Sequence, residues 1–217
     1  ICVDKDADRI KALKKGMMPI HEEGLKELME KGMSSGKLEF TGDLGYGVAN
    51  SKIIFITVGT PSLPDGDVDL TAVREAASGI ASRMDGYRII VNKSTVPVGT
   101  QKLVAGIIRR KLKKDVDFDV LSNPEFLREG SAVYDTLYPD RVVIGADNPK
   151  AAGVLARLYR PMGGKVLITD PESAEMIKYA SNAFLATKIS FINEIANLCE
   201  KTGADITKVA HGMGLDS

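Results

Sequence analysis

The chain has 217 residues, with 29 basic and 29 acidic side chains and an apolar fraction of 44%. This length suits one large domain, or one domain and part of another, and the apolar fraction is sufficient for a sizeable core. The balanced charge argues against a nucleic-acid partner. The lack of an apolar run near ~18 residues argues against a membrane partner. The presence of only two cysteines argues against a disulfide framework. We therefore expect a cytoplasmic protein. The chain begins with Ile-Cys-Val-Asp and no Met, as if inside a strand.

Short β-rich runs alternate with helical patterns through the first 170 residues. Strands are predicted at residues 1–4, 52–57, 88–93, 118–122, 141–145 and 165–169, and helices at 6–15, 23–34, 43–49, 70–84, 99–113 and 149–160. Most of these strands are almost continuously apolar, which is typical of a parallel sheet covered by helices on both faces. The alternation predicts an α/β fold with a doubly wound, Rossmann-like parallel sheet. Ligands bind such sheets at the carboxyl ends of the strands.

A different pattern follows residue 170. Asp170 can cap a helix, Pro171 suits the first helical position, and Glu172 suits the positive end of the helix dipole. Apolar residues then recur at helical spacing over about 31 residues, which predicts a helix of roughly 45 Å. Typical helices have ~11–12 residues. We therefore predict one domain in residues 1–170 and, in residues 171–217, a spine helix that leads out of it.

The first candidate ligand residues follow the first strand. Asp4 ends that strand, and in dinucleotide-binding folds an acidic residue after the second strand binds the ribose hydroxyls of the cofactor. The glycine-rich turn that should precede it by ~20 residues is not in the sequence. The pattern alone leaves two interpretations of equal weight, because Asp4 or Asp6 can simply cap the next helix. Arg9 could reach the same ribose or a phosphate, although a solvated helix face explains it better.

Small and hydroxyl-bearing residues follow the next two strands. The segment Thr57-Val58-Gly59-Thr60 would let a ligand approach the backbone closely, although ordinary turns look similar. Ser94 and Thr95 precede Pro and Gly in a loop that suits a ligand-facing position. There is no G-x-S-x-G elbow, so a nucleophilic serine is not indicated.

Two acidic residues follow the strand at 118–122. Pro124 can begin a short helix, on which Glu125 and Glu129 would share a face, with Arg128 offsetting their charge. An acidic pair at the carboxyl end of a strand suggests general acid–base catalysis or the binding of ligand hydroxyls. A solvated helix is the alternative.

Lys178 and Asn182 lie one turn apart on the predicted long helix. On a largely buried helix they could polarise an oxygen atom, and burial could lower the lysine pKa enough for proton transfer. A solvent-facing stripe is the interpretation that the pattern alone favours.

Three other features do not indicate sites. His21 and His211 have no Cys partner at metal spacing, so we expect no metal. The basic run 109–114 suits a helix C-terminus better than nucleic acid, since no aromatic residues interrupt it. Cys199 falls on an apolar helix face and is expected to be buried.

Together these motifs resemble the UDP-glucose/GDP-mannose dehydrogenase family of nucleotide-sugar dehydrogenases. The resemblance covers essentially the whole chain in the right order. The specific motifs are Ser-Thr-Val-Pro at residues 94–97 and Asn-Pro-Glu-Phe-Leu at residues 123–127, supported by residues 3–9, 19–25, 55–61, 140–145 and 175–185.

The resemblance implies NAD-dependent oxidation of the C6 alcohol of a nucleotide sugar to a carboxylate, through a thioester, with UDP-glucose as the favoured substrate. The implied catalytic residues are Glu125 as the general base, Thr95 holding the water, and Lys178 and Asn182 stabilising charge on oxygen. The implied NAD-binding residues are Asp4, Arg9, Val58, Thr60, Ser94 and Glu129, and the implied sugar-nucleotide contacts are Glu125, Phe126, Leu127, Lys178 and Asn182. It also implies that residues 1–170 bind NAD and that the long helix joins two copies as a homodimer.

Two departures from the family pattern lead us to expect an incomplete enzyme. The opening strand with its glycine-rich turn is lacking, and neither Cys2 nor Cys199 has the Gly-Ser-Cys setting of the catalytic cysteine, which we expect after Ser217. The chain alone is therefore expected to be inactive. GDP-mannose or another nucleotide sugar as substrate, a simple hydroxy-acid dehydrogenase, and a non-catalytic nucleotide-binding module stay open as alternatives.

Overall fold

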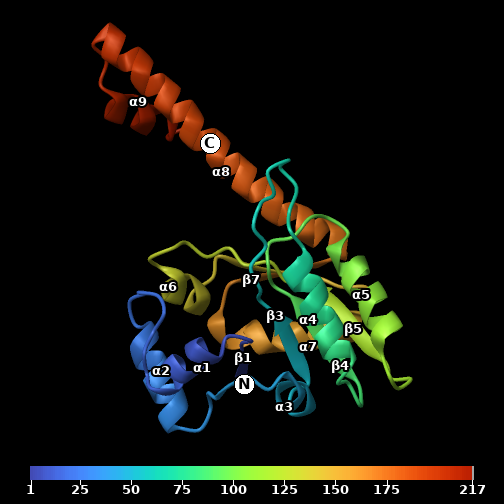
Figure 1. The fold of residues 1–217 in the computed structure, drawn as a ribbon. Coiled ribbons are helices and arrows are strands. Elements are labelled where there is room, and N and C mark those ends of the chain that lie inside the picture. Colours follow the sequence, from blue (N-terminus) through green and yellow to red (C-terminus); the bar gives the residue numbers. More distant parts are fainter. Residues whose placement is uncertain (217) are drawn as a thin grey trace. The chain divides into compact units, whose positions relative to one another are not determined.

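The computed structural model describes residues 1–216 and divides into two compact units, Ile1–Met176 and Ile177–Ser217. The strands are β1 (Cys2–Val3), β2 (Phe40–Thr41), β3 (Ile53–Ile56), β4 (Arg88–Asn92), β5 (Phe118–Ser122), β6 (Arg141–Gly145) and β7 (Lys165–Thr169). The helices of the first unit are α1 (Ala7–Lys14), α2 (Leu25–Ser34), α3 (Leu44–Ala49), α4 (Thr71–Ala81), α5 (Thr100–Lys111), α6 (Ala132–Leu137) and α7 (Pro149–Tyr159), with a 3₁₀ turn at Arg160–Met162. Figure 1 labels these seven helices and most of the strands.

The sheet contains five strands in the order β3-β4-β5-β6-β7. The neighbours β3, β4 and β5 are parallel, and β6 and β7 form a second parallel pair. The two groups meet in an antiparallel contact between Ser122 and Gly145. Two short strands, β1 and β2, form a separate parallel pair. The predicted α/β fold with a Rossmann-like sheet is confirmed, with one antiparallel junction.

Both faces of the central strands are buried, which explains their continuous apolar sequence. Ile90 and Val120 pack against α4 and α5, where Val104 and Ile108 are fully buried. The alternate strand residues, among them Val91 and Leu121, pack against α7 on the opposite face. Figure 1 shows α4 and α5 together on one side of the strands. The carboxyl ends of β3, β4 and β5 therefore meet at one edge that the core holds in place.

The long helix forms as predicted. Helix α8 covers Pro171–Thr202, which is 32 residues, and the Asp170 carboxylate caps it by accepting the N–H of Ser173 at 2.7 Å. That N–H also lowers the pKa of Asp170. In the second unit, α9 (Ile206–Met213) lies alongside the end of α8, and Cys199 is buried as expected (Figure 1).

The middle of α8 differs from our expectation of a largely buried helix. Phe184, Ile189 and Phe191 expose 66%, 53% and 52% of their surface. The other helix of the second unit, α9, lies alongside the end of α8 and leaves these side chains uncovered. Among the described residues, no helix has the combination of length and apolarity that a membrane crossing needs.

A close contact between β6 and the start of α8 generates a stability prediction. A Cβ on Gly145 would lie 2.6 Å from the Cβ of Ala174 and 2.7 Å from the Cα of Pro171. The variant Gly145→Ala should lower the free energy of unfolding by about 1–3 kcal/mol, because backbone atoms must move. Chemical denaturation measures it.

The matched control is Gly106→Ala in α5, where an added Cβ meets nothing within 4 Å. This variant should raise the free energy of unfolding by about 0.5–1 kcal/mol, because alanine favours the helix. Equal stabilities for the two variants would contradict the close packing at Gly145.

Candidate active site

Hydroxyl groups connect the loops that follow β3 and β4. The Ser94 hydroxyl donates to the Val58 carbonyl at 2.7 Å, and the Thr60 hydroxyl donates to the Thr95 carbonyl at 2.7 Å. The two loops are adjacent because β3 and β4 pair in parallel up to Ile56. The structure thus brings four of the predicted site residues together at one edge of the sheet.

Asp4 and Arg9 form an ion pair at the end of β1. The Asp4 carboxylate accepts the N–H of Asp6 at 2.9 Å and the Arg9 guanidinium at 2.9 Å. The Asp6 N–H, followed by Arg9, lowers the pKa of Asp4. The cap of α1 comes from Asp6, which accepts the N–H groups of Asp8 and Arg9 at 3.0 Å each. The cap of α1 is therefore Asp6, as one of the two interpretations allowed, and the binding of a cofactor by Asp4 stays a prediction.

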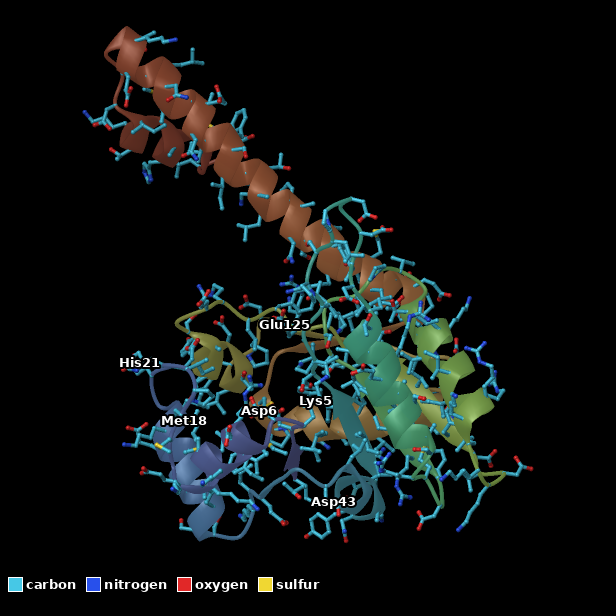
Figure 2. All side chains as sticks on the ribbon, viewed as in Figure 1. Lys5, Asp6, Met18, His21, Asp43 and Glu125 are labelled. Atoms are coloured by element: carbon cyan, nitrogen blue, oxygen red, sulfur yellow. The ribbon has the colours of Figure 1, made fainter. Side chains whose placement is uncertain are left out.

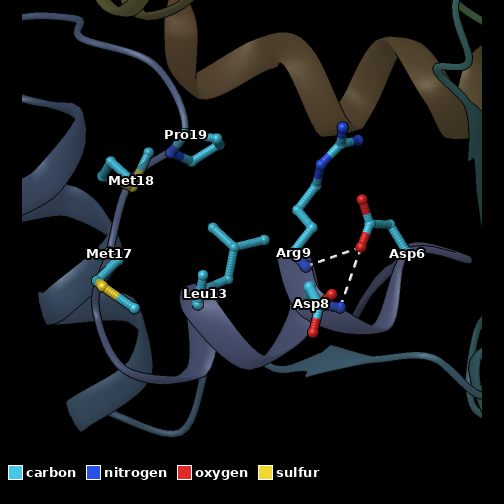
Figure 3. A pocket seen from close by; sticks show the side chains of 8 residues that line it. Asp6, Asp8, Arg9, Leu13, Met17, Met18 and Pro19 are labelled. Atoms are coloured by element: carbon cyan, nitrogen blue, oxygen red, sulfur yellow. Dashed lines mark hydrogen bonds between the residues drawn. The ribbon is translucent and has the colours of Figure 1, made fainter.

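A pocket of about 290 Å³ lies beside α1 (Figure 3). Charged residues border one part of it, and apolar side chains border the rest, including those of Leu13, Met17 and Met18. Arg9 is among the lining residues, and its guanidinium also pairs with Asp4.

The segment after β5 is an extended turn rather than the helix that we predicted. The Glu125 carboxylate accepts the N–H of Leu127 at 2.6 Å, and no helix begins before Ala132. The Glu125 carboxylate bonds a backbone N–H close to it in the sequence, and such local bonds compete with the backbone bonds of a helix. Pro124 also keeps Asn123 out of the helical region. The expectation that Glu125 and Glu129 share a helix face is therefore wrong.

Arg128 does not offset Glu125 either. It pairs with Asp135 in α6, with its Nη2 2.7 Å from Oδ1 and its Nε 3.1 Å from Oδ2. These bonds lower the pKa of Asp135 to about 2. Phe126 packs under the Arg141 guanidinium, whose carbon lies 4.1 Å from the ring centroid. Figure 2 labels Glu125 on this segment.

Glu22 holds the far end of the same segment. Its carboxylate accepts the N–H of Gly130 at 2.8 Å and that of Ala132 at 3.1 Å, across more than 100 residues of sequence. Gly130 has φ of 83°, which a residue with a side chain rarely adopts. The turn that ends the segment and begins α6 is thus fixed from a distant loop.

A network of hydrogen bonds holds the buried Asn123 side chain in place. Its Nδ2 donates to the Val143 carbonyl at 2.8 Å, and its Oδ1 accepts the Tyr159 hydroxyl at 2.6 Å. The Lys93 ammonium donates to the same hydroxyl at 3.3 Å. Burial raises the pKa of Tyr159 to about 12, so the hydroxyl keeps its proton and remains a donor.

Lys178 and Asn182 belong to the second unit. Lys178 is 5% exposed, whereas Asn182 is exposed on the same helix. Their catalytic role stays a prediction, as do the roles of the other predicted site residues.

Sequence reasoning missed Glu22, Tyr159 and Glu175. Glu22 and Glu175 lie in motifs that resemble the family, but nothing local indicates their partners. Glu175 accepts from Ser122, which is 53 residues away. No local signal distinguishes Glu175, because polar and charged residues such as Glu172, Ser173 and Lys178 lie close to it in the sequence.

The support of Asn123 by Tyr159 generates a prediction. The variant Tyr159→Phe leaves the Asn123 oxygen, in a residue that is 1% exposed, without its donor. We expect a loss of about 1–3 kcal/mol in the free energy of unfolding. The control Tyr138→Phe, at a residue that is 65% exposed, should change it by less than about 0.5 kcal/mol. Urea denaturation measures the free energy of unfolding of both variants. An unchanged free energy of unfolding in Tyr159→Phe would refute the supporting role of Tyr159.

Comparison with known proteins places this arrangement in a family. The NAD binding domain of the UDP-glucose/GDP-mannose dehydrogenase family matches residues 1–163, and its central domain matches residues 172–217. UDP-glucose 6-dehydrogenase TuaD from Bacillus subtilis is 54% identical over 217 residues, covering 100% of this chain and 47% of TuaD.

Solved structures agree with this match. A UDP-glucose dehydrogenase from Pyrobaculum islandicum has a TM-score of 0.94 at 42% identity, covering 99% of this chain and 50% of that one. A GDP-mannose dehydrogenase from Pseudomonas aeruginosa has a TM-score of 0.94 at 35% identity, with the same coverage. The chain spans about half the length of the relatives that it matches. The chain belongs to the UDP-glucose/GDP-mannose dehydrogenase family.

Proposed function

We propose that this chain forms the NAD-binding domain, in residues 1–170, and the start of the central domain, in residues 171–217, of a UDP-glucose 6-dehydrogenase. The reaction converts the C6 alcohol of UDP-glucose into the carboxylate of UDP-glucuronate. The observation that carries this proposal is the 54% identity to TuaD along the whole chain. The family matches at residues 1–163 and 172–217 support the two domains.

The proposed NAD contacts carry donors and acceptors of the kind that NAD requires. The Asp4 carboxylate, whose pKa is lowered, is ionised at neutral pH and can accept further hydrogen bonds from ribose hydroxyls. Arg9 beside it can bind a phosphate or the same ribose. Val58, Thr60 and Ser94 present backbone and hydroxyl groups from two loops that are hydrogen-bonded to each other. Glu129 is the remaining proposed NAD contact. When bound, NAD supplies the hydride acceptor.

Glu125 and Thr95 are proposed to act on the water that the oxidation consumes. An alcohol becomes a carboxylate by losing two hydrides and gaining one oxygen from water. The water would attack the carbonyl carbon of the proposed thioester, so that a C–O bond replaces the C–S bond and the cysteine thiolate of the full-length protein leaves. Glu125 would remove a proton from this water, and the Thr95 hydroxyl would hold the water. Both follow strands whose ends are neighbours, since β4 pairs with β5 up to Ser122. Phe126 and Leu127 are the proposed sugar-nucleotide contacts next to Glu125.

Lys178 and Asn182 are proposed to stabilise negative charge on the C6 oxygen and to contact the sugar nucleotide. A lysine that is 5% exposed is shielded from water, where its charge acts more strongly on a nearby oxygen. Asn182 follows one turn later and would donate its amide N–H to the same oxygen.

The experiment is an NADH-formation assay of the full-length protein with UDP-glucose and GDP-mannose. We expect turnover with UDP-glucose and two NADH per sugar. The variant Glu125→Gln should lower kcat by roughly 10²–10⁴-fold, because the general base is lost, and should accumulate a covalent adduct.

Glu27→Gln is the matched control, since Glu27 is exposed on α2, and it should leave kcat unchanged. Turnover with GDP-mannose alone would overturn the substrate proposal. Unchanged turnover in Glu125→Gln would favour a simple hydroxy-acid dehydrogenase. Binding of NAD or UDP-glucose without turnover would favour a non-catalytic module.

A homodimer through the long helix is part of the proposal. Apolar side chains in the middle of α8, including Phe184 and Ile189, are more than half exposed. Such a patch favours association. Phe184→Asp should shift the full-length protein towards monomer in sedimentation velocity, whereas Lys201→Asp, at an exposed position near the other end of the same helix, should not. A monomeric unmodified protein would contradict this part. A cytoplasmic location stays a prediction, supported by two cysteines that are both free.

A further inference from the structure

Glu175 is a buried carboxylate near the start of α8 and is not among the proposed catalytic or binding residues. It is 3% exposed and accepts three hydrogen bonds. Its Oε2 accepts the N–H of Gly99 at 2.6 Å, and its Oε1 accepts the N–H of Gln101 at 2.8 Å and the hydroxyl of Ser122 at 2.9 Å. Burial of a carboxylate is costly unless such donors satisfy it. Burial raises the pKa of Glu175, while the three donors act in the opposite direction.

Two of the donors belong to the beginning of α5, which has no cap of its own. The N-cap residue is Gly99, with φ of 94° and no side chain to accept a backbone N–H. A helix N-terminus leaves such N–H groups without partners and favours a negative charge. Glu175 supplies both the acceptor and the charge from another helix. It therefore fixes the end of the loop that carries Ser94 and Thr95.

The third donor connects Glu175 to the other loop of the candidate site. Ser122 is the last residue of β5, and Asn123, Pro124 and Glu125 follow it directly. The same carboxylate oxygen that accepts from Gln101 holds Ser122. On the other side, α8 continues without a break, and Lys178 follows one turn after Glu175.

We infer that Glu175 is a positioning residue: its carboxylate fixes the loop that carries Thr95 and the segment that carries Glu125 relative to each other and to the first turn of α8. This inference rests on the proposed function, because the loop and the segment supply the proposed catalytic residues Thr95 and Glu125. Glu175 itself is not proposed to touch the substrate.

The test is Glu175→Gln in the full-length protein. The glutamine NH₂ group cannot accept an N–H, so at least one of the three donors loses its partner. We expect kcat with UDP-glucose to fall roughly 10–100-fold, because small misplacements of catalytic groups are costly, while KM changes less than about threefold. Glu175→Asp, which keeps the charge, should recover part of the loss. Activity is normalised to folded protein by circular dichroism.

Amide hydrogen exchange gives a readout that does not depend on activity. In Glu175→Gln, at least one of the amides of Gly99 and Gln101 should exchange at least about tenfold faster, while amides in the middle of α5 stay unchanged. Uniformly faster exchange would indicate a general loss of stability and would overturn the positioning role.

The matched control is Glu172→Gln, one turn earlier on the same helix. Glu172 pairs at the surface with Lys102, so this variant removes the same charge and should leave kcat and the Gly99 and Gln101 exchange rates unchanged.

If Glu175→Gln does not fold, Ser122→Ala removes only one donor and should lower kcat roughly threefold to tenfold. Wild-type kcat in either Glu175→Gln or Ser122→Ala overturns the inference. An unmodified protein without turnover refutes the proposed function instead, and the exchange rates then still test the contacts of Glu175.

Discussion

Burial of both faces of the central sheet is the constraint on which the rest of the first unit depends. Residues that alternate along β4 and β5 pack against α4 and α5 on one face and against α7 on the other. This burial fixes the parallel register, and a slip of one residue would exchange the two faces. The register places Ile56, Asn92 and Ser122 at one edge of the sheet. The loops with the proposed site residues follow directly from those ends.

Polar groups then shape that edge in two layers. In the upper layer, the hydroxyls of Ser94 and Thr60 connect neighbouring loops through backbone carbonyls. In the lower layer, which is the buried one, side chains such as those of Asn123 and Glu175 hold the ends of the loops by hydrogen bonds. Because these lower groups are buried and hydrogen-bonded, they restrict the loops more strongly than surface contacts would. The loops with the proposed site residues thus depend on buried side chains that are not themselves among those residues.

Local sequence patterns were sufficient to predict those strands and helices along which apolar residues recur regularly. Strands β5, β6 and β7 have their predicted bounds, because each contains a short run of apolar, mostly β-branched residues next to polar residues or glycine. The 32-residue helix follows from its proline, its cap and its uninterrupted spacing. Strand β2 was not predicted, because two residues carry no period. The helix predicted at Glu125 was wrong, because the carboxylate binds the N–H of Leu127 and Glu22 holds the turn after it.

The sequence by itself determined the fold class, the order of the elements and the family, because these depend on local periodicity and on motifs of adjacent residues. Only the tertiary structure decided which groups support the site. The partners of Glu22, Tyr159 and Glu175 lie far away along the chain. A buried polar group takes whichever donor the packing brings to it, and no local pattern encodes that choice. Glu175 therefore reads as one acidic residue among many in the sequence, and as a junction of three segments in the fold.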